Sequence, residues 1–185
     1  TLEDQTAINI EFRDHPSLYL CFTKDEIAAA HDHIENGPVI DSYTSTWLNQ
    51  SDIIRLEPRI SQKALGAVYV DGSAEVHSHR LVLAMAKAAE KFGASIKHGT
   101  VTDIIRNGDK ITGIQLNDGN IECDGIVLAM GPWTNLISKR IQYPVDIRPL
   151  KGQIIRAIVP GAPLPISVWS NGNYTATKPD GLLWA

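Results

Sequence analysis

The sequence has little that would indicate a membrane protein, a nucleic-acid-binding protein or a disulfide-rich protein. Its 185 residues contain no apolar run of transmembrane length and no signal peptide. The net charge of −4 gives no electrostatic reason to expect nucleic acid. The two cysteines, Cys21 and Cys123, lack metal-ligand spacing and lie beside apolar residues. We therefore expect a cytoplasmic protein without a membrane span, in which both thiols pack as small hydrophobes.

Several catalytic motifs are also absent or incomplete. There is no phosphate loop of the Walker type, and Asp71-Gly72-Ser73 lacks the Gly-x-Ser-x-Gly frame of a nucleophile elbow. His77 and His79 stand at a turn that enters a helix, with no cluster of carboxylates or cysteines to complete a ligand set. We interpret the two histidines as a solvated helix start and predict no metal site.

What the sequence does contain is typical of a globular protein with a real core. Hydrophobic residues make up 43% of the chain and charged residues 21%. Residues 126–130 form a short apolar run that predicts a strand buried on both faces. Gly131 then permits a sharp turn, and Pro132 suits the first position of a helix. Such a corner is where α/β proteins hold nucleotides, but the spacing alone also fits an ordinary strand-to-helix turn.

Capping signals predict three helices. Thr23 and Glu26 can form a capping box for a helix that runs to about Glu35. Ser51 is expected to cap a short helix that Pro58 closes. From Ser78 onward, an apolar stripe predicts a longer helix that ends at a left-handed glycine, Gly93; this stripe comprises Leu81, Met85, Ala88 and Phe92.

Strand signals lie on both sides of the long helix. Residues 101–105 and 111–116 alternate with period two across Asn107-Gly108-Asp109, which predicts the first hairpin of a three-stranded meander. Asn171-Gly172-Asn173 predicts another hairpin. The remaining expected strands are residues 7–12, 17–22, 66–70, 94–98, 126–130, 147–159, 166–169 and 174–178. The predicted class is α/β to α+β, with part of a parallel sheet, the inserted meander and a separate antiparallel region with helices.

Seven short pieces of the sequence carry a family resemblance when they are read in order. They are Leu56-Glu57-Pro58, Gly66-Ala67 through Asp71-Gly72, the helix of residues 81–92 with Gly93-Ala94, residues 99–104, residues 111–114, residues 126–133, and Arg148-Pro149-Leu150-Lys151-Gly152-Gln153. Together they resemble the FAD-dependent amine and amino-acid oxidoreductases, the family of glycine oxidase, sarcosine oxidase and D-amino-acid oxidase. The likeness is strongest to the glycine-oxidase type.

The resemblance implies two domains and a redox activity. Residues 7–71 and 143–185 would form a discontinuous substrate-binding domain, and residues 72–142 would form part of the FAD-binding domain. The implied reaction is hydride transfer from a small amine or amino-acid substrate to flavin, with FAD as cofactor. No nucleic acid is implied, and whether the protein is a homo-oligomer stays open.

The resemblance also assigns roles by position. The backbone of Val101 would meet the adenine of FAD, and Ala129, Met130 and Gly131 would pass close to the adenosine. Trp133 would lie beside them, either as a contact or as packing. Tyr174 would face the substrate, although a cross-strand core aromatic is an equal alternative. No catalytic residue is assigned within the chain.

The departures from the family pattern favour an internal fragment. The family begins with a strand, a Gly-x-Gly-x-x-Gly motif and a helix that hold the pyrophosphate, and this sequence has none. The arginine that binds the substrate carboxylate in the family would lie past Ala185. Lys178 stands where the family usually has arginine. Residues 182–185 contain no oxygen-activating lysine of the sarcosine-oxidase kind, which favours the glycine-oxidase side or a dehydrogenase. The alternative is a non-catalytic binding or assembly module that kept the scaffold without the cofactor.

Overall fold

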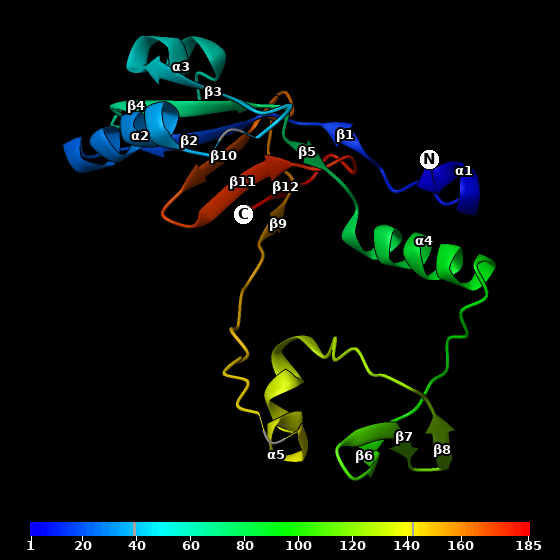
Figure 1. The fold of residues 1–185 in the computed structure, drawn as a ribbon. Coiled ribbons are helices and arrows are strands. Elements are labelled where there is room, and N and C mark those ends of the chain that lie inside the picture. The colour runs from blue at the N-terminus through cyan, green and yellow to red at the C-terminus, as the bar shows by residue number, and fades with distance from the viewer. Residues whose placement is uncertain (39, 142) are drawn as a thin grey trace. The chain divides into compact units, whose positions relative to one another are not determined.

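The computed structural model describes residues 1–38, 40–141 and 143–185, which form two compact units. Unit 1 comprises Thr1–Gly93 together with Ile154–Ala185, and unit 2 comprises Ala94–Gln153. The elements of both are labelled in Figure 1. The predicted domain boundary at residue 142 lies outside the described residues. The two units are defined by contacts within the chain and not by what they bind, so the assignment of substrate-binding and FAD-binding domains stays a prediction.

Unit 1 contains a seven-stranded mixed sheet whose strands come from both ends of the chain. Its order is β3-β4-β2-β10-β11-β12-β9. A separate two-stranded sheet pairs β1, which precedes β2 in the chain, with β5, which follows β4. Only the β2–β10 pairing is parallel, with Leu18 opposite Val168. The strands are β1 Arg13–Asp14, β2 Ser17–Cys21, β3 Thr44–Asn49, β4 Gly66–Asp71, β5 Ala74–Glu75, β9 Arg156–Ala157, β10 Ser167–Ser170, β11 Asn173–Thr177 and β12 Leu183–Trp184.

Among its described residues, unit 1 has four helices, and caps explain where they begin. They are α1 Leu2–Thr6, α2 Lys24–Asn36, α3 Gln50–Leu56 and α4 Ser78–Lys91. The capping box predicted at Thr23 is confirmed, because its hydroxyl accepts from the Glu26 amide while the Glu26 carboxylate accepts from the Thr23 amide. The cap of α3 is Asn49 and not Ser51, since the Asn49 carboxamide oxygen accepts from the Asp52 amide.

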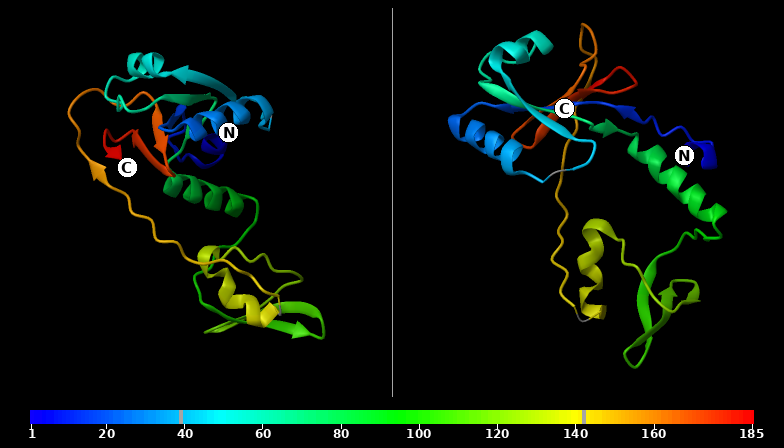
Figure 2. Two further views of the ribbon diagram at one scale, coloured as in Figure 1. Left: turned by 90° about the vertical axis from the view of Figure 1, so that its left-hand side faces the viewer. Right: turned by 45° about the horizontal axis from the view of Figure 1, so that its top comes forward.

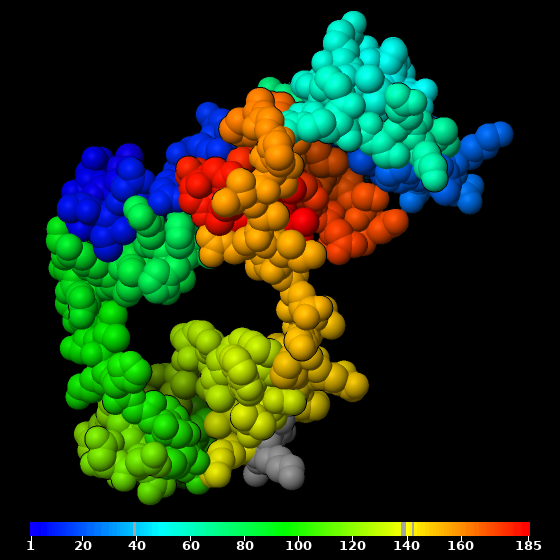
Figure 3. Space-filling model, turned by 180° about the vertical axis from the view of Figure 1, so that it is seen from behind, coloured from blue at the N-terminus to red at the C-terminus, as the bar shows by residue number. Residues whose placement is uncertain are grey.

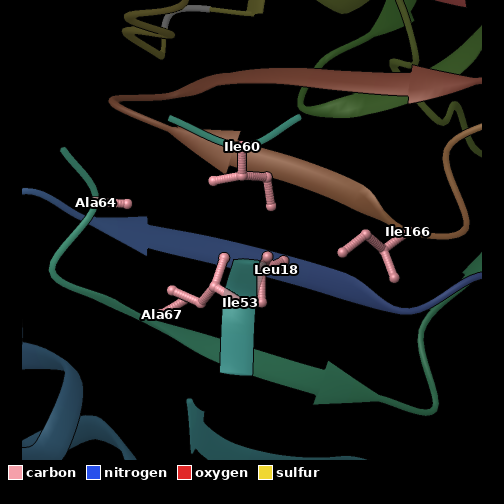
Figure 4. Close-up of a cluster of buried hydrophobic side chains, with 6 residues drawn as sticks. All are labelled: Leu18, Ile53, Ile60, Ala64, Ala67 and Ile166. Carbon is pink, nitrogen blue, oxygen red and sulfur yellow. The ribbon is translucent and has the colours of Figure 1, made fainter. Parts of the chain in front are cut away.

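The two middle helices cover opposite faces of the sheet. Successive side chains of a strand point to opposite faces. On one face, α3 packs Ile53 against Leu18 and Ala67. On the other face, α2 packs Ala30 against Cys21 and Val68. Figure 2 shows α2 and α3 on the two sides of the strands, and the cluster around α3 is drawn in Figure 4. Burial of Cys21 agrees with its expected role as a small hydrophobe.

The C-terminal residues lie inside this sheet and not at its edge. β12 pairs with β11 on one side and with β9 on the other. Beyond β12, the backbones of Ile155 and Ala185 exchange two hydrogen bonds of 2.7 and 2.9 Å. Figure 3 shows the segment leading through β9 (orange) beside the C-terminal residues (red).

Unit 2 is built on the predicted meander. Its antiparallel sheet has the order β6-β7-β8, with β6 Val101–Asn107, β7 Lys110–Leu116 and β8 Gly119–Glu122. The first turn contains Gly108 at φ 61°, as expected of a tight hairpin. A 3₁₀ helix, η1 Gly131–Ile137, and a short helix, α5 Ser138–Ile141, follow.

Two predicted strands are wrong in the same way. Residues 94–98 and 126–130 have no strand conformation. A strand needs a hydrogen-bonding neighbour, and the described strands of unit 2 pair only with one another as β6-β7-β8. Instead of being buried on both faces, Val127 is 91% exposed. The apolar run is present, but Ile126 and Leu128 are only half-buried and its other three residues are exposed.

Three further expectations need correction. Residues 7–12 are not a strand, and the strand expected over residues 147–159 is limited to β9. The predicted apolar stripe of α4 is only partly buried, because Ala84 and Ala88 are enclosed whereas Met85 and Phe92 are 58% and 80% exposed. The helix lies against α1, and its buried residues are the small ones, Ala84 and Ala88. Among the described helices, none is long and apolar enough to cross a bilayer.

Candidate functional site

Unit 1 contains a cavity of about 690 Å³ beside the end of β11. Its wall includes Tyr174, the residue predicted to face the substrate, and Trp184 from β12. Six charged side chains also line it: Glu11, Glu75, Arg80, Arg156, Lys178 and Asp180. Because apolar rings and charged groups converge in one hollow, the cavity is suited to a small polar ligand.

Tyr174 belongs to a row of aromatic rings across three neighbouring strands. Trp169 is paired with Tyr19 of β2 and with Tyr174 of β11 in the sheet register. The ring centroids are 5.7 Å apart for Tyr19–Trp169 and 4.9 Å apart for Trp169–Tyr174, and both pairs are stacked. Tyr174 is therefore a cross-strand aromatic that also reaches the cavity, so the two predicted alternatives are compatible.

A half-buried ionic cluster centred on Glu75 forms part of the cavity wall. The Glu75 carboxylate accepts from Arg13 Nη2 at 2.7 Å, from Lys178 Nζ at 2.8 Å and from Ser167 Oγ at 3.3 Å. Arg13 also donates to the carbonyl of Thr177 at 2.5 Å. These bonds tie β1 and β5 to β10 and to the end of β11.

The protonation states of this cluster follow from its surroundings. Burial works to raise the pKa of Glu75, but the hydrogen bonds from Lys178 and Arg13 together outweigh it, so the pKa lies below its ordinary value. Burial lowers the pKa of His15, whose ring is 5% exposed, and the nearby Glu75 carboxylate only partly opposes this. At neutral pH the cluster therefore contains an ionised carboxylate beside a neutral imidazole.

The residues predicted to hold the adenine of FAD all lie in unit 2. Val101 begins β6, an edge strand of the meander, and is 49% exposed. Ala129 and Met130 are exposed residues of an irregular segment. Trp133 is 60% exposed and its amide donates to the Met130 carbonyl at 3.2 Å. Its predicted alternatives, ligand contact or packing, both stay open.

Gly131 adopts a backbone conformation that favours glycine. Its φ is 55°, in the left-handed region, and a Cβ added at this position would meet no atom within 4 Å. The backbone at this corner is therefore open to close approach. The hydroxyl of Thr134 donates to the Gly131 carbonyl at 2.7 Å and closes the first turn of η1.

An ion pair joins the two parts of the predicted adenine site. Arg140 of α5 pairs with Asp103 of β6, and the Arg140 carbonyl accepts from Arg106 Nη2 at 2.6 Å. The hydrogen bond from Arg140 lowers the pKa of Asp103, with the Ile104 amide adding to the effect. Arg140 thus holds the helical segment that follows Gly131 against the strand that begins at Val101. Their convergence on a single adenine-sized hollow stays a prediction.

Sequence reasoning missed most of the cavity. Lys178 could have been placed beside Tyr174, because residues four apart on a strand share a face. Glu75 could not have been found, since its partners Arg13 and Lys178 lie 62 and 103 positions away. His77, considered as a metal ligand, instead lies on the cavity wall as the N-cap of α4. Among the described residues, no group of three or more side chains could hold a metal ion.

Comparison with known proteins places this chain in a family. A family profile described as FAD dependent oxidoreductase matches residues 1–185. Glycine oxidase of Geobacillus kaustophilus is 26% identical over 179 residues, which cover 96% of this chain and 47% of that enzyme. The hydrogen cyanide synthase subunit HcnC of Pseudomonas aeruginosa is 32% identical over 112 residues, covering 59% of this chain and 27% of that protein.

The fold agrees with these matches. The crystal structure of the Geobacillus kaustophilus glycine oxidase superposes with a TM-score of 0.87 at 24% identity, covering 99% of this chain and 50% of that one. The predicted mixed α/β class is thereby confirmed. The chain spans about half the length, or less, of the curated relatives it matches.

Proposed function

The chain belongs to the FAD dependent oxidoreductase family, and on this basis we propose that it is part of an enzyme that oxidises a small amine or amino acid. The oxidation would remove a hydride from the substrate, for which FAD would supply the acceptor when bound, and the imine product would hydrolyse in water. The observation that carries the proposal is the match of the family profile over the whole chain, joined to a glycine-oxidase fold. FAD supplies the redox chemistry when bound, while the protein binds and orients the substrate and excludes water.

The domain assignment is part of this proposal. Residues 7–71 and 143–185 form the substrate-binding domain, and residues 72–142 belong to the FAD-binding domain. The seven-stranded sheet supports a discontinuous domain, because it joins β2 to β4 with β9 to β12. Within it, the cavity lined by Tyr174 is the proposed site for the substrate.

The residues of this chain that we propose as FAD contacts would all lie at the adenosine part of the cofactor. The open backbone at Gly131 and the edge position of Val101 suit contacts that use main-chain groups. Ala129, Met130 and Trp133 complete the proposed adenosine contacts. The Gly-x-Gly-x-x-Gly motif that would hold the pyrophosphate is absent from these 185 residues. We therefore expect this chain by itself to bind FAD weakly or not at all.

Two measurements test this assignment. After incubation with FAD and gel filtration, the 185-residue chain should elute without stoichiometric flavin absorbance. Adenosine at millimolar concentration should nevertheless shift the amide NMR signals of Val101 and Gly131. In the variant Gly131→Ala, adenosine binding should weaken roughly tenfold, because a Cβ would occupy the space that the ligand needs.

Gly108→Ala is the matched control for this variant. Gly108 also has a positive φ, 61°, and open surroundings in unit 2, but it lies in the β6–β7 turn. The strain of a left-handed alanine is therefore common to both variants, and only Gly131→Ala should affect adenosine. A tight yellow complex of the chain would contradict the expected weak FAD binding. Unchanged Val101 and Gly131 signals would contradict the adenine site.

A non-catalytic binding or assembly module that kept the scaffold without the cofactor is the second candidate. The two candidates differ in what the gene encodes before residue 1. A strand followed by Gly-x-Gly-x-x-Gly would support the enzyme, whereas a stop codon in frame would support the module.

A further inference from the structure

Three aromatic side chains of unit 1 form a row that leads from the cavity to the protein surface. Tyr174 lines the cavity, and Trp169 stacks with it at a centroid separation of 4.9 Å. Tyr19 of the next strand stacks with Trp169 at 5.7 Å and is 44% exposed. Both separations lie within the range of about 4.5–7 Å in which aromatic rings interact directly. The rings are therefore close enough for an electron to pass from one to the next.

The surroundings of each ring determine what happens to it after it loses an electron. An oxidised tyrosine becomes a neutral radical once its phenol proton has left, and the exposed side chain of Tyr19 can release this proton to water. Trp169 cannot do the same, because its indole Nε1 is buried and its N–H has no acceptor among the described residues. An oxidised Trp169 therefore keeps its proton as a radical cation, and it becomes neutral again by taking an electron from a neighbouring ring.

The charge at the cavity end gives the row a direction. The ammonium of Lys178 lies 5.4 Å from the ring centroid of Tyr174, where it opposes the formation of positive charge on that ring. The Glu75 carboxylate beside this ammonium is shared with a second cation, so it does not neutralise both. In the described part of the chain, no cation lies over the ring of Trp169 or Tyr19. Positive charge in the row is therefore more stable towards Tyr19 than at Tyr174.

We propose that the row of Tyr174, Trp169 and Tyr19 conducts oxidising equivalents from the cavity to the surface and so protects the cavity wall from radicals. A one-electron oxidant in the cavity takes an electron from Trp169, directly or through Tyr174. Trp169 then takes an electron from Tyr19, whose phenol proton passes to water and leaves a tyrosyl radical at the surface. In sum, Tyr19 loses one electron and one proton, and the oxidant gains the electron.

The oxidant expected in the cavity is a radical derived from hydrogen peroxide, because peroxide is what an amine oxidase forms from oxygen. This origin of the oxidant rests on the proposed function. Conduction along the row does not, since it depends only on the three rings and the charges beside them.

A photo-oxidant attached beside the row tests conduction in the 185-residue chain without flavin. The background carries Cys123→Ser and Asn173→Cys, which place a reactive thiol at an exposed position next to Tyr174, while Cys21 is buried. A ruthenium bipyridyl label on this thiol is illuminated with a cobalt ammine complex as the electron acceptor, so that trivalent ruthenium forms as the one-electron oxidant. A nitroso spin trap captures tyrosyl radicals, and peptide mass spectrometry locates them. Because no flavin is present, failure of the proposed enzyme activity leaves this result unaffected.

Tyr43 is the internal control, because it is 48% exposed and lies in the same unit but outside the row. Tyr19 should carry more spin trap than Tyr43. Trp169→Phe keeps an aromatic ring that is much harder to oxidise, so it should lower the adduct on Tyr19 to the level of Tyr43. Trp47→Phe removes another half-buried tryptophan of unit 1 and should leave the adduct on Tyr19 unchanged.

Lys178→Met tests the direction of conduction. Without the ammonium, positive charge at Tyr174 is no longer opposed, so part of the adduct should move from Tyr19 to Tyr174. Equal capture at Tyr19 and Tyr43 with the row intact would overturn the proposal. Undiminished capture at Tyr19 in Trp169→Phe, with folding verified by circular dichroism, would also overturn it. An unchanged distribution in Lys178→Met would overturn the assigned direction.

Discussion

Unit 1 contains two clusters of enclosed apolar side chains, whereas in unit 2 most large apolar side chains reach solvent. Leu18 and Ile53 of unit 1 have no exposed surface. In unit 2, Leu136 and Leu150 are 66% and 96% exposed. Among the residues whose side chains are described, Ile137 is the one hydrophobic residue of unit 2 that is buried.

The difference shows what each part of the chain needs in order to be stable. Unit 1 places helices on both faces of a seven-stranded sheet, so alternate residues of its strands are covered. Unit 2 has a complete hydrogen-bonded meander but little apolar surface removed from water. A small sheet without a covered face is of marginal stability by itself. We therefore expect unit 1 to determine the stability of the chain.

The largest expected effect comes from removing a core side chain of unit 1. Leu18→Ala should lower the free energy of unfolding by about 3–5 kcal/mol, because it removes buried contacts and leaves a cavity. Leu136→Ala makes the same chemical change in unit 2 and should have an effect within about 0.5 kcal/mol. Urea unfolding followed by circular dichroism measures both. Equal losses in the two variants would contradict the comparison.

A smaller effect is expected at the ionic cluster of unit 1. Glu75→Gln leaves Arg13 and Lys178 without their shared carboxylate and should destabilise the chain by about 3 kcal/mol. Glu90→Gln, on an exposed position of α4, is the control and should change stability by less than about 0.5 kcal/mol. The measurement is again the free energy of unfolding at pH 7.

The same variant should change the response to acid. The folded pKa of Glu75 is lowered, so its ionised form stabilises the fold above the unfolded pKa of about 4.3. This contribution is lost as the pH falls from there through the folded pKa. Glu75→Gln has no such group and should lose less stability than the unmodified chain below about pH 4.3. Parallel acid curves for the two proteins would contradict this assignment.

The smallest effect is expected within unit 2. Asp103→Asn removes the ion pair with Arg140, in which both side chains are more than 40% exposed. Amide hydrogen exchange in β6 should accelerate by less than about fivefold, because exposed pairs contribute little. Exchange in β2 and β4 should not change. Loss of protection throughout unit 1 would show that the two units are more strongly coupled than their separate cores imply.

The parts of the fold that could be predicted are those that short stretches of sequence determine. The Thr23 capping box, the meander turn at Gly108 and the long helix before Gly93 depend on neighbours a few residues away. The prediction of a strand at residues 126–130 was wrong, because a strand is buried only where other elements cover it. The residues of the strand alone do not determine which elements lie beside it.

The candidate site divides in the same way. The family resemblance picks out Tyr174, which the structure places on the cavity wall, and glycine permits the positive φ found at Gly131. The Glu75 cluster could not be predicted, because it joins β1, β5 and the end of β11 through contacts between residues far apart in the chain. Long-range ion pairs leave no periodicity in the sequence. Only the folded arrangement reveals that two cations share one carboxylate.

Because β12 lies between β11 and β9, truncating the chain after residue 182 would disrupt the cavity wall. Removing residues 183–185 would delete a strand between two others, so β9 would lose its partner together with the Ile155–Ala185 bonds. Trp184 would be deleted with the strand, and Arg156, which lies 4.8 Å over its ring, would no longer be held there. Three residues thus connect β9 to the rest of the sheet, and one of them, Trp184, is part of the cavity wall.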